Sequence, residues 1–167
     1  MVAGKPFPGG DFDPRQFAGA LADLSPGTRA VVSRAYTEAY GYASEIIGSA
    51  HLLMGLVADP SHSIAAALRE RRVDLAAVRH RFEQITGTHR PESPRHIHLA
   101  FSPHAKAVLI TAVDCARNAG AVLTGVDHLW LAISRADGAV ARRILADLGQ
   151  LDYLQQLCGE SGSPTEL

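Results

Sequence analysis

The chain has 167 residues, of which 47% are hydrophobic, and its formal net charge is −1 at pH 7. A chain of this length can bury an apolar core unaided, and the charge argues against a nucleic-acid partner, because such proteins present a basic face to the phosphates. Since no apolar run approaches the roughly 20 residues that cross a bilayer and the amino terminus lacks an apolar signal segment, we expect a cytoplasmic protein without a membrane partner.

Residues 1–23 are predicted to form a flexible leader. Three prolines precede Arg15, and a Gly-Gly pair follows the second of them, a composition that favours an extended or disordered chain. Phe7, Phe12 and Phe17 recur at intervals of five. The alternative is therefore an arm that docks on the rest of the protein.

Four short helices are predicted in residues 24–86. Each follows a residue that can cap a helix, and the first cap is followed by proline at the first helical position, where its missing N–H is no loss. In chain order the predicted starts are Ser25-Pro26, Gly48-Ser49, Ser61 or Ser63, and Asp74. Apolar residues at spacings of three and four mark the inner faces of these helices.

The same pattern occurs a second time. Gly48 to Leu56 resembles Gly125 to Ile133 at an offset of 77 residues, and nine of the 33 positions from Ser25 to Val57 are identical at that offset. Near the end of the repeat the offset becomes 76, because one residue is lost in a turn. The chain is therefore predicted to be a tandem repeat.

No segment shows the alternation of a half-buried strand. We therefore predict an all-α protein, a pseudo-twofold tandem repeat of two four-helix units with about eight helices. The predicted parts are a leader (1–23), repeat 1 (24–86), a linker rich in turn formers (87–100), repeat 2 (101–158) and a flexible tail (159–167), with both repeats in one domain.

Candidate catalytic and metal groups are sparse. His51 and His128 occupy equivalent places, which predicts a structural role in the first turn of a helix, with the ring bonding the backbone or packing between repeats. His96 and His98 lack a cysteine or acid that would complete a ligand set. Cys115 and Cys158 lack CxxC spacing and are predicted to be reduced, buried thiols. We expect no enzyme, no cofactor and no metal.

The duplicated motifs resemble a known family. Two copies of S-P-x-x-[RK]-A-V, each followed by G-x-x-H-L-x-x-x-[LIV], are similar to the Clp N-terminal (Clp R) domain of ClpA- and ClpC-type unfoldases, from Leu24 to Cys158. The resemblance implies a domain that receives substrates and adaptors. ATP is hydrolysed in those unfoldases by AAA+ modules, and the phosphate-binding pattern G-x-x-x-x-G-K-[ST] is absent from this sequence.

The resemblance implies two sites. In ClpC-type domains a phosphorylated arginine meets a hydroxyl at the start of the first helix and an acid of a G-T-E-H motif; the matching positions here are Ser102 with Asp127, and Ser25 with Ala50 in a degenerate first copy. In actinobacterial relatives an apolar groove bounded by basic residues binds peptides and cyclic-peptide antibiotics. Its matching positions are Leu21, Arg29, Val32, Phe101, Lys106 and Leu109. Phe101 could equally be a hydrophobic staple at the start of its helix.

The predicted function is a non-catalytic Clp N-domain-like binding protein. It would receive peptides, degradation-marked proteins, adaptors or cyclic-peptide ligands, and deliver them to a Clp protease system or sequester them from it. One alternative is the N-terminal domain of a full-length ATP-dependent Clp unfoldase. The composition of the tail after Gly159, which resembles a linker, favours this alternative. Another is a protein that sits on a Clp ring and tunes its assembly.

Overall fold

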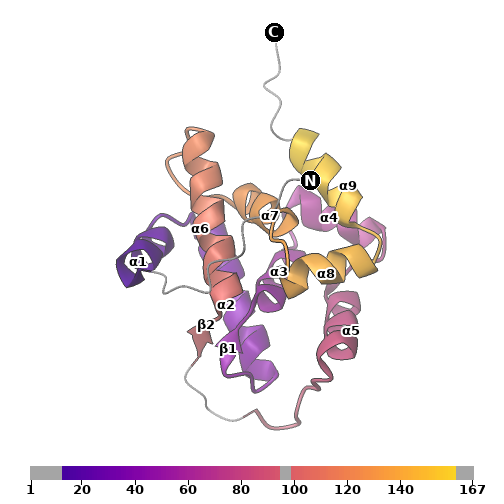
Figure 1. Cartoon of the computed structure of the whole chain (residues 1–167). Helices are drawn as coiled ribbons and strands as arrows, with labels where there is room; N and C mark the ends of the chain where they lie inside the picture. The colour runs from indigo at the N-terminus through magenta and orange to yellow at the C-terminus, as the bar shows by residue number, and fades with distance from the viewer. Residues whose placement is uncertain (1–12, 95–98, 161–167) are drawn as a thin grey trace, which may run out of the picture.

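The computed structural model describes residues 13–94 and 99–160 (Figure 1). The helices of this part are α1 (Pro14–Ala22), α2 (Pro26–Gly41), α3 (Ser49–Val57), α4 (Ser63–Glu70), α5 (Leu75–Thr86), α6 (Pro103–Asn118), α7 (Val126–Ser134), α8 (Val140–Asp147) and α9 (Leu151–Glu160). Two strands of two residues each, β1 (Ile46–Ile47) and β2 (Ala100–Phe101), complete the list. The predicted all-α class is confirmed.

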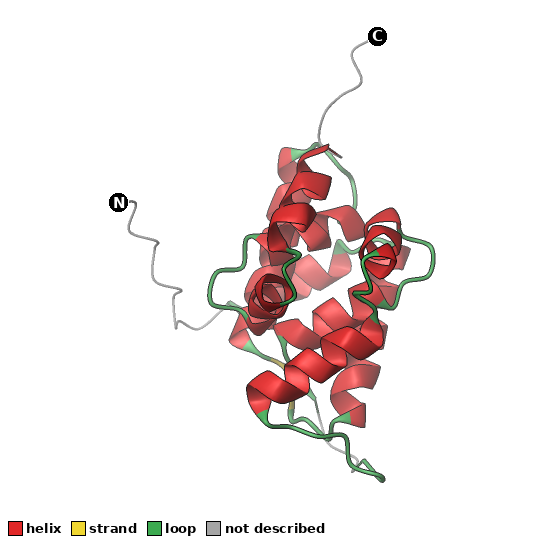
Figure 2. Ribbon diagram, turned by 90° about the vertical axis from the view of Figure 1, so that its right-hand side faces the viewer, coloured by secondary structure: helices red, strands yellow, loops and turns green. Residues whose placement is uncertain are grey.

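The helices repeat as the sequence repeats. The first residues of α2 and α6, of α3 and α7, and of α4 and α8 are each 77 positions apart (26 to 103, 49 to 126, 63 to 140), whereas α5 and α9 begin 76 positions apart (75 to 151). The missing residue falls in the turn before α9, as predicted. In the view of Figure 2 the connecting loops lie at the periphery of the helical body.

Equivalent caps start the equivalent helices. The hydroxyls of Ser25 and Ser102 accept hydrogen bonds from backbone N–H groups three residues on, at 3.2 and 3.1 Å. In α3 and α7 the Nδ1 atoms of His51 and His128 each accept the N–H of the glycine three residues earlier, both at 2.9 Å. This confirms that the two histidines have a structural role. Such caps satisfy N–H groups that have no partner inside the helix.

One local prediction was wrong, and another was confirmed for one of its two alternatives. Residues 14–22 of the predicted flexible leader form α1, with Asp13 as N-cap and proline at the first position. Of the two predicted starts of the third helix, Ser63 is the first residue of α4, and its N-cap is His62, whose ring accepts the N–H of Ile64 at 3.3 Å. Ser61 does not start that helix, because its N–H and hydroxyl both bond the Asp59 carboxylate at 3.0 and 2.9 Å.

One apolar core spans both repeats, and α3 lies at its centre. Every residue of α3 is buried, and it contacts α2, α5 and α8. The close approach of α3 to α2 requires Gly55, because a Cβ there would lie 2.5 Å from the Val31 carbonyl oxygen. Trp130 is the largest fully buried side chain of α7. Since these helices are too short to persist alone, this shared burial holds them together.

The two repeats exchange short strands. Residues 46–47 of β1 pair in parallel with residues 100–101 of β2, and Leu24 bridges to Thr124 at the equivalent place, 77 residues away for each partner. The N–H of Ser25 donates to the Thr124 carbonyl and that of Ser102 to the Ile47 carbonyl, both at 3.0 Å. Each entry segment is thus bonded to the opposite repeat. Strands of two residues cannot show the alternation by which strands are recognised in a sequence.

The segment after α5 is fixed by charge. Arg90 donates to the Glu38 carboxylate at 2.9 Å, and Arg79 from α5 binds the same carboxylate with two nitrogens. Burial works to raise the pKa of Glu38, but the bonds and charges of the two guanidinium groups outweigh it and hold that pKa below its usual range. Within the predicted linker, Arg90 therefore anchors residues 87–94 to α2.

None of the described helices is long and apolar enough to span a membrane.

Candidate binding surface

α1 lies along one flank of α6 (Figure 1). The ring of Phe17 meets the ring of Phe101 edge to face, with centroids 5.2 Å apart and planes inclined by 66°. The ammonium of Lys106 lies 5.5 Å from the centroid of the same Phe17 ring. An aromatic edge and a cation are two groups that favour an aromatic ring between them. Phe101 and Lys106 thus form the contact site of Phe17, the one aromatic residue of α1, and we call this contact site the aromatic seat.

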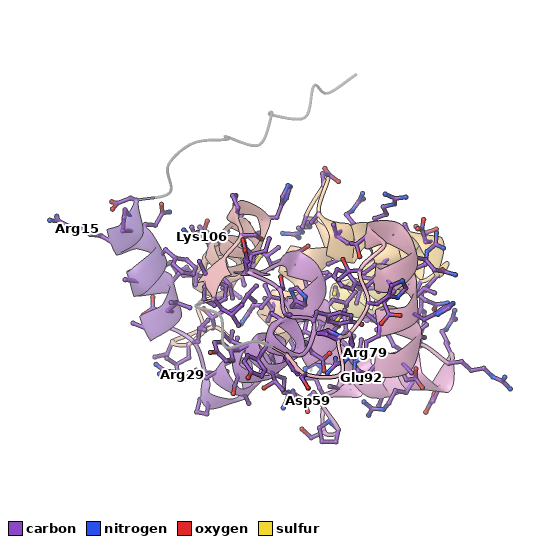
Figure 3. All side chains as sticks on the ribbon, turned by 90° about the horizontal axis from the view of Figure 1, so that it is seen from below. Arg15, Arg29, Asp59, Arg79, Glu92 and Lys106 are labelled. Atoms are coloured by element: carbon purple, nitrogen blue, oxygen red, sulfur yellow. The ribbon has the colours of Figure 1, made fainter. Side chains whose placement is uncertain are left out.

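Arg29 holds the other end of α1. Its Nε donates to the Leu24 carbonyl at 3.1 Å and its Nη2 to the Ala22 carbonyl at 3.2 Å. A cation at a helix C-terminus satisfies orphan carbonyls and is favoured by the helix dipole. Figure 3 places Arg29 and Lys106 on the side of the molecule that faces α1. We call Arg29, Phe101 and Lys106 the α1-docking surface.

The six predicted groove residues separate into three groups. Arg29, Phe101 and Lys106 form the α1-docking surface, and Leu21 belongs to the helix that covers it. Val32 is partly buried against the core, and Leu109 is fully buried within it. Phe101 has Lys106, not an apolar residue, at the staple position of α6, so it packs on Phe17 instead. Ligand binding by these residues stays a prediction.

The predicted phosphoarginine residues do not lie together. Asp127 lines a hollow with Cys115 and Ala119, near the C-terminal end of α6, whereas Ser102 caps the N-terminus of that helix. At 1.5 Å per residue, Ser102 and Cys115 are about 20 Å apart along α6. The Ser102 side chain is also buried as a cap, and the alanine of the degenerate copy, Ala50, is buried in the core. Any role of Asp127 in phosphoarginine binding therefore has to do without Ser102.

Asp127 has a partner that the sequence did not indicate. The Nε2 atom of His62, from repeat 1, lies 2.9 Å from the Asp127 carboxylate. The hollow beside this pair has a volume of about 200 Å³ and is lined by both cysteines of the chain and by Ile64 and Leu131. Burial, and secondarily the charge of Asp127, raises the pKa of Cys158 to about 11. That thiol is therefore protonated near neutrality and is no activated nucleophile.

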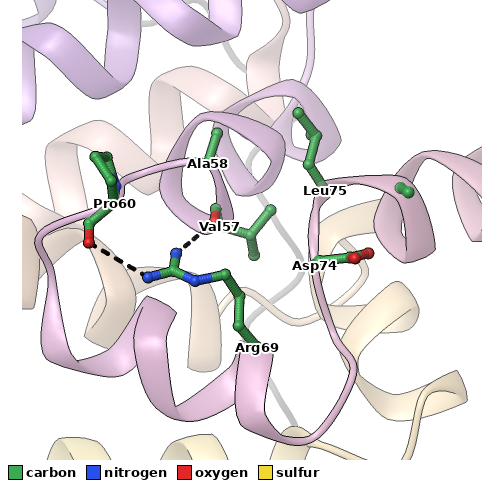
Figure 4. A pocket seen from close by; sticks show the side chains of 7 residues that line it. Val57, Ala58, Pro60, Arg69, Asp74 and Leu75 are labelled. Atoms are coloured by element: carbon green, nitrogen blue, oxygen red, sulfur yellow. Dashed lines mark hydrogen bonds between the residues drawn. The ribbon is translucent and has the colours of Figure 1, made fainter.

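Another hollow, with a volume of about 430 Å³, lies between the end of α3 and the start of α5 (Figure 4). Arg69 reaches across it and donates to the carbonyls of Val57 at 3.3 Å and Pro60 at 3.4 Å. Asp74 on its rim caps α5. Both charged groups thus complete helix ends, and neither is left for a ligand.

No three side chains of the types His, Cys, Asp and Glu come close enough to hold a metal ion in residues 13–94 and 99–160. His96 and His98 lie outside the described residues.

α1 was not predicted from the sequence, although a signal for this helix was present. Asp13-Pro14 has the same cap-then-proline order as Ser25-Pro26, and Phe17, Ala20 and Leu21 follow at helical spacing.

Comparison with known proteins gives a family. The model of the Clp repeat (R) N-terminal domain matches residues 23–148. The chaperone protein ClpB of Oceanobacillus iheyensis is 29% identical over 119 residues, which are 71% of this chain and 14% of that protein. The chloroplastic chaperone ClpC1 of Arabidopsis thaliana is 30% identical over 119 residues, 71% of this chain and 13% of that protein. The chain thus spans about one seventh of these relatives.

Solved structures share the fold. The N-terminal domain of ClpD from Arabidopsis thaliana has a TM-score of 0.67 at 18% identity, and the match covers 86% of this chain and 99% of that domain. The N-terminal domain of the ClpV1 ATPase from E. coli has a TM-score of 0.60 at 19% identity, with coverage of 92% and 97%. At these identities the likeness establishes the fold alone.

Proposed function

The chain belongs to the Clp repeat (R) N-terminal domain family, and from this premise we propose that it is a non-catalytic binding protein that receives peptide segments at the α1-docking surface. The observation that carries the proposal is the edge-to-face seat at Phe101 and Lys106, which already holds an aromatic side chain. Aromatic anchors in such seats supply much of the energy of peptide and protein recognition. Peptides, unfolded proteins, adaptors and cyclic peptides can all present such an anchor.

The chemistry of the remaining groups supports a binding role. The histidines that start α3 and α7 are committed to backbone caps, and the carboxylate of Asp127 is paired with His62. The thiol of Cys158 has its pKa raised by burial, which opposes nucleophilic catalysis. We therefore assign the protein no covalent step and no cofactor. Its mechanism is equilibrium binding.

We propose that the protein, with or without a bound client, interacts with components of a Clp protease and its unfoldase. A free domain that binds the same clients as the N-terminal domain of an unfoldase competes with it by mass action. A domain that also touches the unfoldase delivers clients instead. The alternative, a receiving domain at the front of a longer unfoldase, uses the same surface, and the larger size of the relatives supports it.

The test is a fluorescence-anisotropy titration with a labelled, reduced and carboxymethylated protein, which cannot fold. Phe101→Ala is expected to weaken binding at least about tenfold, because hot-spot aromatic residues at interfaces have effects of this size. Tyr36→Ala, which truncates an exposed aromatic residue in the middle of α2, is the control and should bind as the wild type does. Equal binding by the two variants would remove the α1-docking surface from the proposal.

Two further titrations separate ligand classes. Free phosphoarginine, measured by calorimetry, tests Asp127, with Asp127→Asn as the variant. A hydrophobic cyclic peptide tests Phe101. Added to a Clp unfoldase and protease degrading a tagged client, the chain slows degradation if it sequesters clients and accelerates it if it delivers them.

A further inference from the structure

α1 has the properties of a bound ligand. It has nine residues, and isolated helices of that length are not stable in water. One face of it is buried on α6: Ala20 is buried, and Phe17 and Leu21 are partly buried against the core. The opposite face, which includes Arg15 and Gly19, is exposed. The helix therefore depends on the surface beneath it for its stability.

The contacts of α1 form a short recognition pattern. The ring of Phe17 occupies the seat of Phe101 and Lys106, Leu21 follows one helical turn later, and the last carbonyls accept from Arg29. Only Asp23, Leu24 and Ser25 separate α1 from α2. So short a connection keeps α1 near its surface at an effective concentration in the millimolar range or above.

We propose that α1 is an internal competitor of the α1-docking surface, and that the partner of this surface is a short amphipathic helix with an aromatic residue and a leucine four positions later. Such a helix replaces α1, takes the seat of Phe17 and presents its own last carbonyls to Arg29. The inference rests on the proposed binding role of this surface. It adds the class of partner and the means by which the surface is kept covered until that partner arrives.

Gly19 allows a test that leaves the surface untouched. A Cβ at this position would have no atom within 4 Å, so substitutions change the stability of α1 without changing what it contacts. Gly19→Ala strengthens the helix because alanine is the better helix former, and Gly19→Pro breaks it. If α1 competes with a partner, these two variants must change the partner's affinity in opposite directions.

The probe is a fluorescent peptide with the sequence of residues 13–24, titrated against the full chain and its variants. We expect Gly19→Ala to weaken binding about fivefold, and Gly19→Pro to strengthen it roughly tenfold or more, because apparent affinity is proportional to the fraction of protein with α1 undocked. A peptide carrying Phe17→Ala is the matched control and should not bind. Far-UV circular dichroism and cooperative melting establish that the variants fold.

The outcomes are distinct. Equal affinity for wild type, Gly19→Ala and Gly19→Pro overturns the competition, and no binding even to Gly19→Pro overturns the helical partner class. If Gly19→Ala alone folds, a weakened affinity supports the inference and an unchanged one refutes it. Dimers of the wild type that Phe17→Ala abolishes would show that the occupant is a second copy of the chain, contrary to the proposal. Binding of the unfolded probe protein is measured separately, so the proposed function stands or falls by itself.

Discussion

His51 should make the stability of this protein depend on pH above the range in which carboxylates titrate. His51 is 3% exposed, and its ring packs against the rings of Phe82, with centroids 5.4 Å apart, and Tyr42, with centroids 6.2 Å apart. Nδ1 accepts the Gly48 N–H, and Nε2 is buried without a partner among the described residues. A protonated ring can accept no hydrogen bond, so protonation breaks the cap and places a charge in an apolar site.

The magnitude follows from the pKa. Burial lowers the pKa of His51 from 6.5 to about 4, although the charge of Glu38 works in the opposite direction. The folded state therefore binds fewer protons than the unfolded state, so stability is complete above pH 6.5 and is lost as the pH falls toward 4. At 1.36 kcal/mol per pH unit the loss from this one ring between pH 7 and pH 4.5 is about 2.5 kcal/mol.

The assay is urea unfolding of the wild type and His51→Gln at several values between pH 7 and pH 4.5, followed by circular dichroism. His51→Gln should be less stable at pH 7, because it loses ring packing and the cap, but its stability should fall by about 2.5 kcal/mol less over this range. His128→Gln removes the equivalent cap from α7 and serves as the control for cap loss at pH 7. Titration of the ring C–H signals by NMR reports the His51 pKa directly.

Equal pH dependence of the wild type and His51→Gln would refute this reasoning. So would a His51 ring signal that titrates near 6.5, because the ring would then be hydrated and the packing against Phe82 loose.

Three other predictions concern stability and reactivity. Gly55→Ala should lower the free energy of unfolding by about 2 kcal/mol or more in urea, because its Cβ meets the backbone of α2, whereas Gly19→Ala should not lower it. Glu38→Gln should cost about 3 kcal/mol, since it leaves two partly buried guanidinium groups without their carboxylate, and an unchanged melting midpoint would contradict this. In Cys115→Ser, iodoacetamide at pH 8 should modify Cys158 about 100-fold more slowly than a thiol of pKa 9, and the rate should rise up to about pH 11.

The repeat made most of the fold predictable. Ser25 and Ser102 each cap a helix of 16 residues, and the segments of His51 and His128 each start one of nine, because the same residues at the same spacing meet the same backbone requirements. An offset of 77 residues therefore conveyed helix positions that single-helix periodicity alone would have left ambiguous. It also indicated the turn in which one residue is missing.

The relation between the repeats was not predictable in the same way. The strand exchange rests on backbone bonds of Leu24 and Phe101, which any side chain can accompany, so the sequence carries no sign of it. The contact of His62 with Asp127 joins the N-cap of α4 to α7 of the other repeat, and the two residues lie 65 positions apart in the sequence. The resemblance placed Ser102 and Asp127 in one site because it assigned each site to one repeat. Contacts between repeats decide where such residues lie.

The strand exchange also explains why α1 packs along α6. Because Leu24 is bonded to Thr124 of repeat 2, the helix before it lies beside α6. In the described part of the linker, Arg90 contacts α2 of repeat 1 through Glu38. The first helix of each repeat is thus contacted by the segment that precedes the other repeat.

The two segments, α1 and the described part of the linker, differ in the contacts that hold them in place. Arg90 of the linker is fixed by the Glu38 carboxylate and lies 5.0 Å from the centroid of the Tyr42 ring, and both ends of the described linker join ordered elements, α5 and β2. α1 is held by the ring contact of Phe17, by the apolar contacts of Ala20 and Leu21, and by the bond of Arg29 to Ala22. The bond of Arg90 to the buried Glu38 carboxylate joins two opposite charges, whereas the bond of Arg29 to the Ala22 carbonyl joins a charge to a neutral group. The segment that a partner can replace is therefore α1, and the exchangeable surface is the α1-docking surface of Arg29, Phe101 and Lys106.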